Sequence, residues 1–207
     1  MTISLCVFSD DWEQPNKKIL SKWGAGVPNL EDGQLQLMLE PGRLLRHNSD
    51  HLFNRCATVP LTNGVWEHVA MVFDRTSSSA EILINCEPSG AISGIPNEPP
   101  ALARFSHFQL QFGGITTSGG YQPKDGASFK MDNLRWYKAA LTPDADPLKA
   151  DCLECGCGNL DINAIIDAIC ADSGNMPTST QGVIEAIAAQ ITNPELKPCA
   201  KLILQQL

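Results

Sequence analysis

Apolar and polar residues alternate along much of the first two thirds of the chain. The alternation is plain at 34–39, 81–86 and 108–112, and a period of two indicates strands with one buried and one solvated face. Turn residues such as Asn63-Gly64 separate these segments at short intervals, which is typical of a β-sandwich. The expected strands cover 2–8, 18–23, 34–39, 42–46, 52–59, 65–73, 80–86, 106–113 and 127–138.

The pattern changes after residue 142. Apolar residues recur at helical spacing from Ile162 to Cys170 and again from Ile184 to Ile191, and Pro198 suits the first position of a third helix. Helices this short are marginal alone, so we expect them to pack together, on the sandwich or on a neighbour. The predicted units are a β-sandwich at 1–142, a Cys-rich linker at 143–158 and a three-helix appendage at 159–207.

Composition excludes several classes of protein. The 207 residues are 43% hydrophobic and 18% charged, which is typical of a globular chain. A net charge of -8 disfavours a nucleic-acid partner, because phosphate binding needs clustered Lys and Arg. We expect no membrane insertion, since no run of eighteen apolar residues occurs, and Met1–Phe8 lacks the basic lead of a signal peptide.

Eight cysteines are many for a chain of this length, and five of them fall in the last 56 residues. An even count favours disulfides in an extracellular chain, whereas Cys-x-x-Cys also supplies zinc ligands. Three states therefore stay open for the tail: disulfides, a zinc site on Cys152, Cys155 and Cys157, or free thiols. A Cys56–Cys86 bridge is a further expectation, and Cys6 is expected to be a buried packing residue. The disulfide candidates are Cys56, Cys86, Cys152, Cys155, Cys157, Cys170 and Cys199.

Two segments carry a resemblance to a known family. Residues 63–74 read Asn-Gly-Val-Trp-Glu-His-Val-Ala-Met-Val-Phe-Asp, and residues 129–142 read Phe-Lys-Met-Asp-Asn-Leu-Arg-Trp-Tyr-Lys-Ala-Ala-Leu-Thr. Both resemble hallmark segments of laminin-G-like, or concanavalin A-like, jelly-roll domains. The segments at 2–7 and 19–24 resemble two further strands of the family. The resemblance covers residues 1–142 and implies an antiparallel jelly roll that binds sugars or proteins.

The resemblance also implies a place for calcium. In the family calcium often lies on the rim of the sandwich, held by oxygen ligands of the kind that calcium prefers. Asp132 and Asp125 are the metal candidates by this comparison, while a turn or backbone-capping carboxylate is the plainer alternative. Glucanases of the same fold carry Glu-x-Asp-x-Glu on one strand, and this chain lacks that motif. We therefore predict that the protein is not an enzyme.

Two aromatic residues fall in polar or glycine-rich stretches. Trp12 follows Asp10 and Asp11, and Tyr121 lies between Gly120 and Gln122. An exposed aromatic ring can stack on the apolar face of a sugar, so Trp12, Tyr121, Asp10 and Asp11 form the predicted ligand-binding set. The alternative for both rings is packing under a loop.

The resemblance departs from the family at its start. The family has one more strand before the segment that corresponds to 2–8, and its absence leaves an open sheet edge at 127–138. A longer parent chain, the helical tail or a strand from a neighbour can cover such an edge. The favoured function is therefore a non-catalytic structural or adhesion subunit that assembles with copies of itself or other subunits and contacts glycans or glycoproteins. A monomeric lectin-like module and, more weakly, a glycan-active hydrolase are the alternatives. The expected location is extracellular, at a cell or virion surface.

Overall fold

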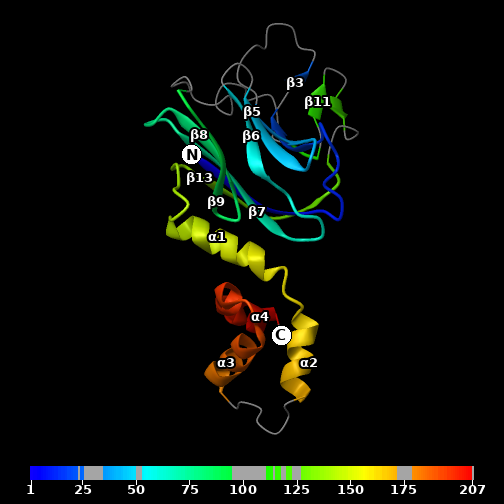
Figure 1. The fold of residues 1–207 in the computed structure, drawn as a ribbon, viewed down its shortest axis with the longest axis vertical. Coiled ribbons are helices and arrows are strands. Elements are labelled where there is room, and N and C mark those ends of the chain that lie inside the picture. Colours follow the sequence, from blue (N-terminus) through cyan, green and yellow to red (C-terminus); the bar gives the residue numbers. More distant parts are fainter. Residues whose placement is uncertain are drawn as a thin grey trace.

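The computed structural model shows a β-sandwich with a helical appendage on one side, and a single helix, α1, lies between the two parts (Figure 1). The prediction of a mainly β sandwich followed by short helices is confirmed. The structure describes residues 1–22, 24–25, 35–49, 53–94, 111–113, 115–117, 120–122, 127–171 and 179–206.

Two five-stranded antiparallel sheets form the sandwich. The first sheet has the order β13-β1-β7-β8-β9, with bounds Lys130–Tyr137, Thr2–Phe8, Glu67–Asp74, Ser79–Ile84 and Glu87–Ser93. The second has the order β10-β2-β4-β5-β6, with bounds Gln111–Phe112, Lys18–Lys22, Leu35–Glu40, Leu44–Ser49 and Phe53–Pro60. A small third sheet joins β12 (Gly120–Gln122), β11 (Ile115–Thr117) and β3 (Gly24–Ala25).

The core lies between the inner faces of the two large sheets. Ile3 and Leu5 of β1 and Met71 of β7 pack into it with Leu37 of β4 and Leu45 of β5, and none of these side chains is exposed. Their period of two confirms the alternation that predicted the strands. Apolar burial of this kind is the main force that holds the two sheets together.

Strand β9 was not predicted, because Pro88 and Gly90 are turn residues in most contexts. The strand tolerates them because it lies at the edge of its sheet, where a missing backbone N–H breaks no second ladder. The buried Ser89 then joins the two sheets. Its hydroxyl accepts hydrogen bonds from the backbone N–H groups of Thr58 and Val59 at 3.2 and 3.1 Å.

Most of the segment 143–158, which we expected to link the two units, forms the helix α1 at Asp146–Cys157. The helix lies on the outer face of the first sheet, where Leu148 packs against Ala70, Val72 and Leu83. Strand β7 is consequently buried on both faces. The cysteines suggested a linker, and α1 has too few apolar residues to show a helical stripe.

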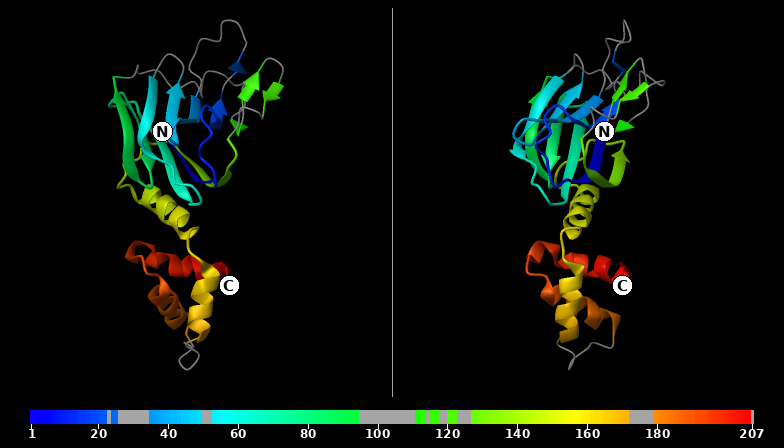
Figure 2. Two further views of the ribbon diagram at one scale, coloured as in Figure 1. Left: turned by 45° about the vertical axis from the view of Figure 1, so that its right-hand side comes forward. Right: turned by 90° about the vertical axis from the view of Figure 1, so that its right-hand side faces the viewer.

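The remaining helices form a separate small core (Figure 2). Its main members are Ile165, Ile187, Ile191, Cys199 and Ile203, each less than a tenth exposed. The third predicted helix begins two residues later than Pro198 indicates, because a 3₁₀ segment precedes it. The bounds are Ile162–Ala171 for α2, Thr180–Gln190 for α3, Pro194–Cys199 for the 3₁₀ helix η3 and Ala200–Gln206 for α4.

His47 of β5 makes the sandwich sensitive to acid. Its ring is 1% exposed and meets the Phe73 ring edge-on, with the ring centres 4.7 Å apart. Burial disfavours the charged imidazolium and lowers the pKa of His47 from 6.5 to about 3. The unfolded chain therefore takes up this proton below pH 6.5, whereas the folded chain does so only near pH 3. The stability that the neutral ring contributes is complete above pH 6.5 and declines as the pH falls toward 3.

We expect His47→Phe to make the free energy of unfolding depend less steeply on pH in the acid range below 6.5. One proton difference corresponds to about 1.4 kcal/mol per pH unit, so the variant loses about that much slope below the pKa of the unfolded histidine. Denaturant unfolding at several pH values measures this slope directly. The two proteins are compared by the slope of the free energy of unfolding against pH. The free energy at any single pH is not compared, because the substitution also changes the packing around the ring. A variant with the wild-type slope would contradict the assignment.

Candidate functional site

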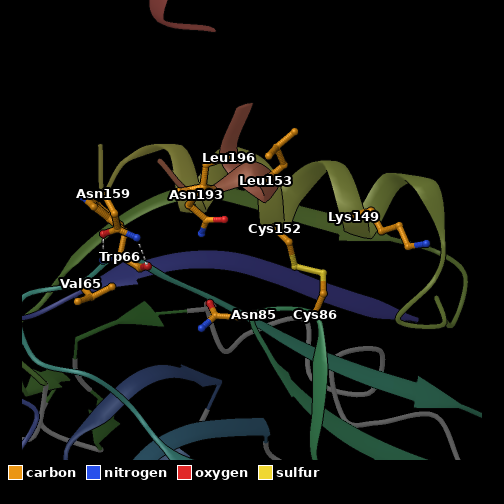
Figure 3. Close-up of a pocket in the computed structure, with 11 residues that line it drawn as sticks. Val65, Trp66, Asn85, Cys86, Lys149, Cys152, Leu153, Asn159, Asn193 and Leu196 are labelled. Carbon is orange, nitrogen blue, oxygen red and sulfur yellow. Dashed lines mark hydrogen bonds between the residues drawn. A yellow bond between two sulfur atoms is a disulfide. The ribbon is translucent and has the colours of Figure 1, made fainter. Parts of the chain in front are cut away.

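A pocket of about 750 Å³ opens between the first sheet and α1 (Figure 3). We call it the junction pocket, because the sandwich, α1 and the stretch from Asn193 to Leu196, which includes the start of η3 (Pro194–Cys199), all contribute to its wall. Its lining comprises Val65, Trp66, Asn85, Cys86, Lys149, Cys152, Leu153, Gly156, Asn159, Asn193 and Leu196.

Amide side chains of the junction pocket already hold the two parts of the molecule together. The Asn159 side chain accepts a hydrogen bond from the backbone N–H of Trp66 at 2.7 Å and donates one to the carbonyl of Trp66 at 2.9 Å (Figure 3). Asn85 accepts from the backbone N–H of His68 at 3.0 Å. These groups therefore serve the structure. Trp66 is half-buried, with the Phe8 ring centre 5.5 Å away.

Two disulfides connect α1 to the rest of the chain, which confirms the prediction of disulfides in the tail. Cys86–Cys152 ties the helix to the sandwich, and Cys157–Cys199 ties it to the appendage. The expected Cys56–Cys86 bridge is wrong. Cys56 is exposed in β6 of the second sheet, whereas Cys86 follows β8 in the first sheet and lies under α1.

The three close cysteines of the tail do not converge on one point, as a zinc site on Cys152, Cys155 and Cys157 requires. Cys152 bonds to the sandwich and Cys157 to the appendage. Cys155 is buried against Cys6, and both the contact with the Cys6 thiol and burial raise the pKa of the Cys155 thiol. Cys6 is the buried packing residue that was predicted, and Cys170 is an exposed free thiol.

A buried chain of polar side chains runs between the first sheet and α1. His68 Nε2 lies 2.7 Å from Ser4 Oγ, and the Ser4 hydroxyl donates to Asp151 Oδ2 at 2.7 Å. Asp151 also accepts from the Tyr137 hydroxyl at 2.8 Å and pairs with Arg135. Burial lowers the pKa of His68 to about 4, which keeps its ring neutral near pH 7. Sequence reasoning missed this network because its members come from distant segments.

A second, smaller pocket of about 380 Å³ lies where β1 ends and β13 begins. We call it the rim pocket, and its lining comprises Phe8, Ser9, Asp10, Asp11, Gln14, Ser128, Phe129 and Lys130. Two of the predicted ligand-binding residues, Asp10 and Asp11, thus fall in one pocket. The side chain of Gln14 fixes its shape, accepting from the backbone N–H of Ser128 at 2.8 Å.

The charged groups of the rim pocket are largely available to a ligand. Asp10 is exposed and makes no hydrogen bond or ion pair within the part of the chain that the structure describes. One oxygen of Asp11 accepts from the backbone N–H of Glu13 at 2.8 Å, which leaves the other oxygen toward solvent. The Lys130 ammonium lies 4.7 Å above the centre of the Phe8 ring.

The prediction that Trp12 contacts a ligand is wrong, because its side chain is fully buried in the core. Its ring centre lies 6.3 Å from that of Phe129, and its backbone N–H donates to Asn63 Oδ1 at 2.9 Å. Polar neighbours in the sequence concealed an inward-pointing residue, so the alternative of packing under the loop holds. Tyr121 belongs to β12, but its side chain lies outside the described residues.

The calcium candidates are not brought together in the described part of the chain. Asp132 is exposed on β13, and its carboxylate accepts from the backbone N–H of Asn133 at 2.7 Å. Asp125 lies outside the described residues. Within the described residues, the one group of three or more His, Cys, Asp or Glu side chains around a point is His68, Cys86 and Cys152. A calcium site on the rim stays a prediction.

Comparison with solved structures finds chains of similar fold. The chain resembles the Ruminococcus gnavus IT-sialidase CBM40 bound to α2,3-sialyllactose, with 16% identity, a TM-score of 0.55, and coverage of 72% of this chain and 80% of that one. A putative carbohydrate binding protein from Bacteroides ovatus is similar with 20% identity, a TM-score of 0.52, and coverage of 69% and 38%. A leech intramolecular trans-sialidase is similar with 16% identity, a TM-score of 0.51, and coverage of 75% and 23%.

None of the curated proteins matches the chain. The sequence profile of the Concanavalin A-like lectin/glucanases superfamily, by contrast, matches residues 4–145. The match includes both segments that suggested the family, and the two sheets are arranged as a jelly roll requires. The chain therefore belongs to the Concanavalin A-like lectin/glucanases superfamily.

Proposed function

We propose that this protein is a non-catalytic carbohydrate-binding module whose glycan site is the rim pocket. The proposal rests on one observation, which is that the carboxylates of this pocket are exposed and largely without partners in the described part of the protein. Asp10 and one oxygen of Asp11 face solvent in a hollow of about 380 Å³. The junction pocket is larger, but its amides Asn85 and Asn159 already bind backbone groups.

The rim pocket offers the two kinds of contact that sugars need. Carboxylate oxygens accept hydrogen bonds from hydroxyl groups, and these charge-assisted bonds are stronger than neutral ones. Phe8 and Phe129 line the same hollow and provide apolar surface for a sugar ring. Because Asp10 and Asp11 repel anions, we favour a neutral glycan, with Lys130 as a donor at the edge of the site.

The comparisons support carbohydrate binding without catalysis. The similar module from Ruminococcus gnavus is described as bound to sialyllactose, and the similar protein from Bacteroides ovatus as putatively carbohydrate-binding. The carboxylates that line the two pockets, Asp10 and Asp11, are both exposed. A general acid in glycoside hydrolysis depends on burial to stay protonated, so exposure favours recognition over hydrolysis.

We also propose an extracellular location. Two disulfides persist best in an oxidising compartment. No helix among the described residues is long and apolar enough to cross a membrane.

The assembly function also stays a prediction, and one feature favours it. Strand β13 is the outermost strand of its sheet in the described residues, and Met131, Leu134 and Trp136 on it are 38 to 44% exposed. An apolar edge strand of this kind is where a strand from a neighbour can add.

We expect Asp10→Asn to weaken glycan binding by about tenfold or more, which matches the loss of one charge-assisted hydrogen bond. A glycan array first identifies the bound sugar. Titration calorimetry with that sugar then compares the wild type with Asp10→Asn and Lys130→Ala, with and without a calcium chelator. Lactose and sialyllactose serve as a matched neutral and anionic pair.

Asp144→Asn is the control, since Asp144 is a highly exposed carboxylate that does not line the pocket and pairs with Lys149 at the surface. We expect this variant to bind as the wild type does. An array without any bound glycan, or equal affinities for Asp10→Asn and the wild type, would overturn the proposal.

A further inference from the structure

We propose that reduction of the Cys86–Cys152 disulfide turns one wall of the junction pocket into a binding site for a thiophilic divalent metal such as zinc, with His68 as the third ligand. His68 Nδ1 lies 3.0 Å from Cys152 Sγ and 4.0 Å from Cys86 Sγ. The three ligand atoms all lie within 4.8 Å of one another. The set differs from the zinc candidates that the sequence indicated, because two of its members come from the sandwich.

The hydrogen bonds of the buried network determine which nitrogen of His68 is free. The Ser4 hydroxyl has one hydrogen, which it donates to Asp151 Oδ2 at 2.7 Å. At its 2.7 Å contact with His68 Nε2, Ser4 must therefore accept, so Nε2 carries the ring proton. Nδ1 then has a bare lone pair, and it points at the two sulfur atoms.

This lone pair lacks a hydrogen-bond donor in the oxidised protein, because the sulfurs of a disulfide carry no hydrogen. His68 is 1% exposed, so the lone pair has little access to water. A buried acceptor without a donor is unfavourable. A metal ion held by both sulfurs satisfies it, since neutral imidazole is a common metal ligand.

The chemistry balances with an external dithiol as the reductant. The dithiol gives two electrons and two protons to the Cys86–Cys152 bond, the S–S bond breaks, two thiols form, and the reductant becomes a disulfide. Metal binding then releases the two thiol protons, because thiolates are the ligands. Two thiolates and one divalent ion sum to zero charge, which suits a partly buried wall.

The side chains of His68, Cys86 and Cys152 need to move little to form a tetrahedral zinc site. In tetrahedral zinc sites with Zn–S near 2.3 Å and Zn–N near 2.0 Å, adjacent N and S ligands are about 3.5 Å apart and two S ligands about 3.8 Å apart. The two N–S distances here lie on either side of that value, and the sulfurs only have to separate after reduction. Cys86 and Cys152 line the junction pocket, so an ion has a path of entry and its fourth position faces solvent (Figure 3).

The surroundings of His68 are those of a metal ligand. Metal-bound histidines almost always donate their other ring N–H to a fixed acceptor, which holds the ring in place. Ser4 is that acceptor, and Asp151 orients Ser4 in turn. Removing such an outer partner costs about 10- to 100-fold in metal affinity. The proposal is independent of glycan binding, because the rim pocket shares none of these residues.

Cobalt titration of the reduced full-length protein tests the site, because cobalt reports thiolate ligands by charge-transfer bands and tetrahedral geometry by intense visible absorption. We expect one cobalt per chain, displaced by zinc, and none in the oxidised protein. Cys152→Ser should weaken cobalt binding by more than about 100-fold, and Ser4→Ala by about 10- to 100-fold.

Cys157→Ser is the matched control, since it removes another disulfide cysteine of the same helix. It should leave the cobalt spectrum unchanged, because the appendage that it loosens supplies none of the three ligands. Near-ultraviolet circular dichroism shows whether each variant is folded. If Cys152→Ser does not fold, Ser4→Ala and the stoichiometry of the wild type decide the question. A reduced wild type that binds no cobalt, or equal losses in Cys152→Ser and Cys157→Ser, would overturn the proposal.

Discussion

Replacing Cys157 and Cys199 by serine is expected to melt the helical appendage while the sandwich stays folded. The Cys157–Cys199 bridge closes a loop across 42 positions, and loop-closure entropy for that length corresponds to about 4 kcal/mol. The appendage core contains few buried apolar residues, and its three α-helices have only 10, 11 and 7 residues. Helices of that length depend on packing, so a loss of this size should exceed what the core alone supplies.

Far-ultraviolet circular dichroism against temperature measures this effect. We expect an early loss of helical signal in the double variant, followed by the β transition at its usual temperature. Hydrogen exchange should show lost protection in α2, α3 and α4 and unchanged protection in β1 and β7. The controls are Cys56→Ser and Cys170→Ser, which remove exposed free thiols and should change the stability by less than about 0.5 kcal/mol. A single transition at the wild-type temperature would contradict the prediction.

Removing the carboxylate of Asp151 is expected to destabilise the junction of α1 and the first sheet by about 3 to 5 kcal/mol. Asp151 is 1% exposed, and its oxygens accept from Ser4, Tyr137 and Arg135. Asp151→Ala leaves the hydroxyl groups of Ser4 and Tyr137 without their acceptor and removes one of the two carboxylates that pair with Arg135. The cost of these unmet groups, more than the lost attraction itself, makes the effect large.

Denaturant unfolding of Asp151→Ala measures the loss. Glu154→Ala is the matched control, because Glu154 pairs with the same Arg135 from the same helix but its side chain is 32% exposed. A pair in contact with water contributes little, so we expect less than about 1 kcal/mol there. Equal losses in the two variants would show that burial of the carboxylate is not the cause.

The local pattern of apolar and polar residues was sufficient to predict most strands of the sandwich. Residues 2–5 of β1 alternate between polar and apolar, as the pleat of a strand predicts, whereas β7 is a nearly continuous apolar run because both of its faces are buried. The same logic failed for β9, whose Pro88 is acceptable only because that strand has an edge position. It failed again for α1, because the apolar surface on which Leu148 of this helix packs belongs to the sheet.

The predicted ligand-binding residues also differ in how well the local sequence pattern indicated their position. Asp10 and Asp11 were predicted from the sequence because they precede an aromatic residue in a polar stretch, and both line the rim pocket. Trp12, one residue further, was assigned to the surface because its neighbours are polar, yet its side chain points into the core. The direction of a loop side chain depends on the chain that crosses beneath it, which local pattern does not contain.

The sequence alone determined the family, the sandwich and the helical nature of the tail, and it favoured disulfides among three possible states of the cysteines. The first three properties follow from short-range periodicity and from two motif segments. Only the tertiary structure decided that Cys86 pairs with Cys152, that Cys56 stays free, and that Ser4, His68 and Asp151 form one network. The bonded pairs are separated by 64 to 147 positions in the chain. Pairing of β1 with β7 brings Ser4 to His68, and the packing of α1 on the sheet brings Asp151 and Cys152 to their partners.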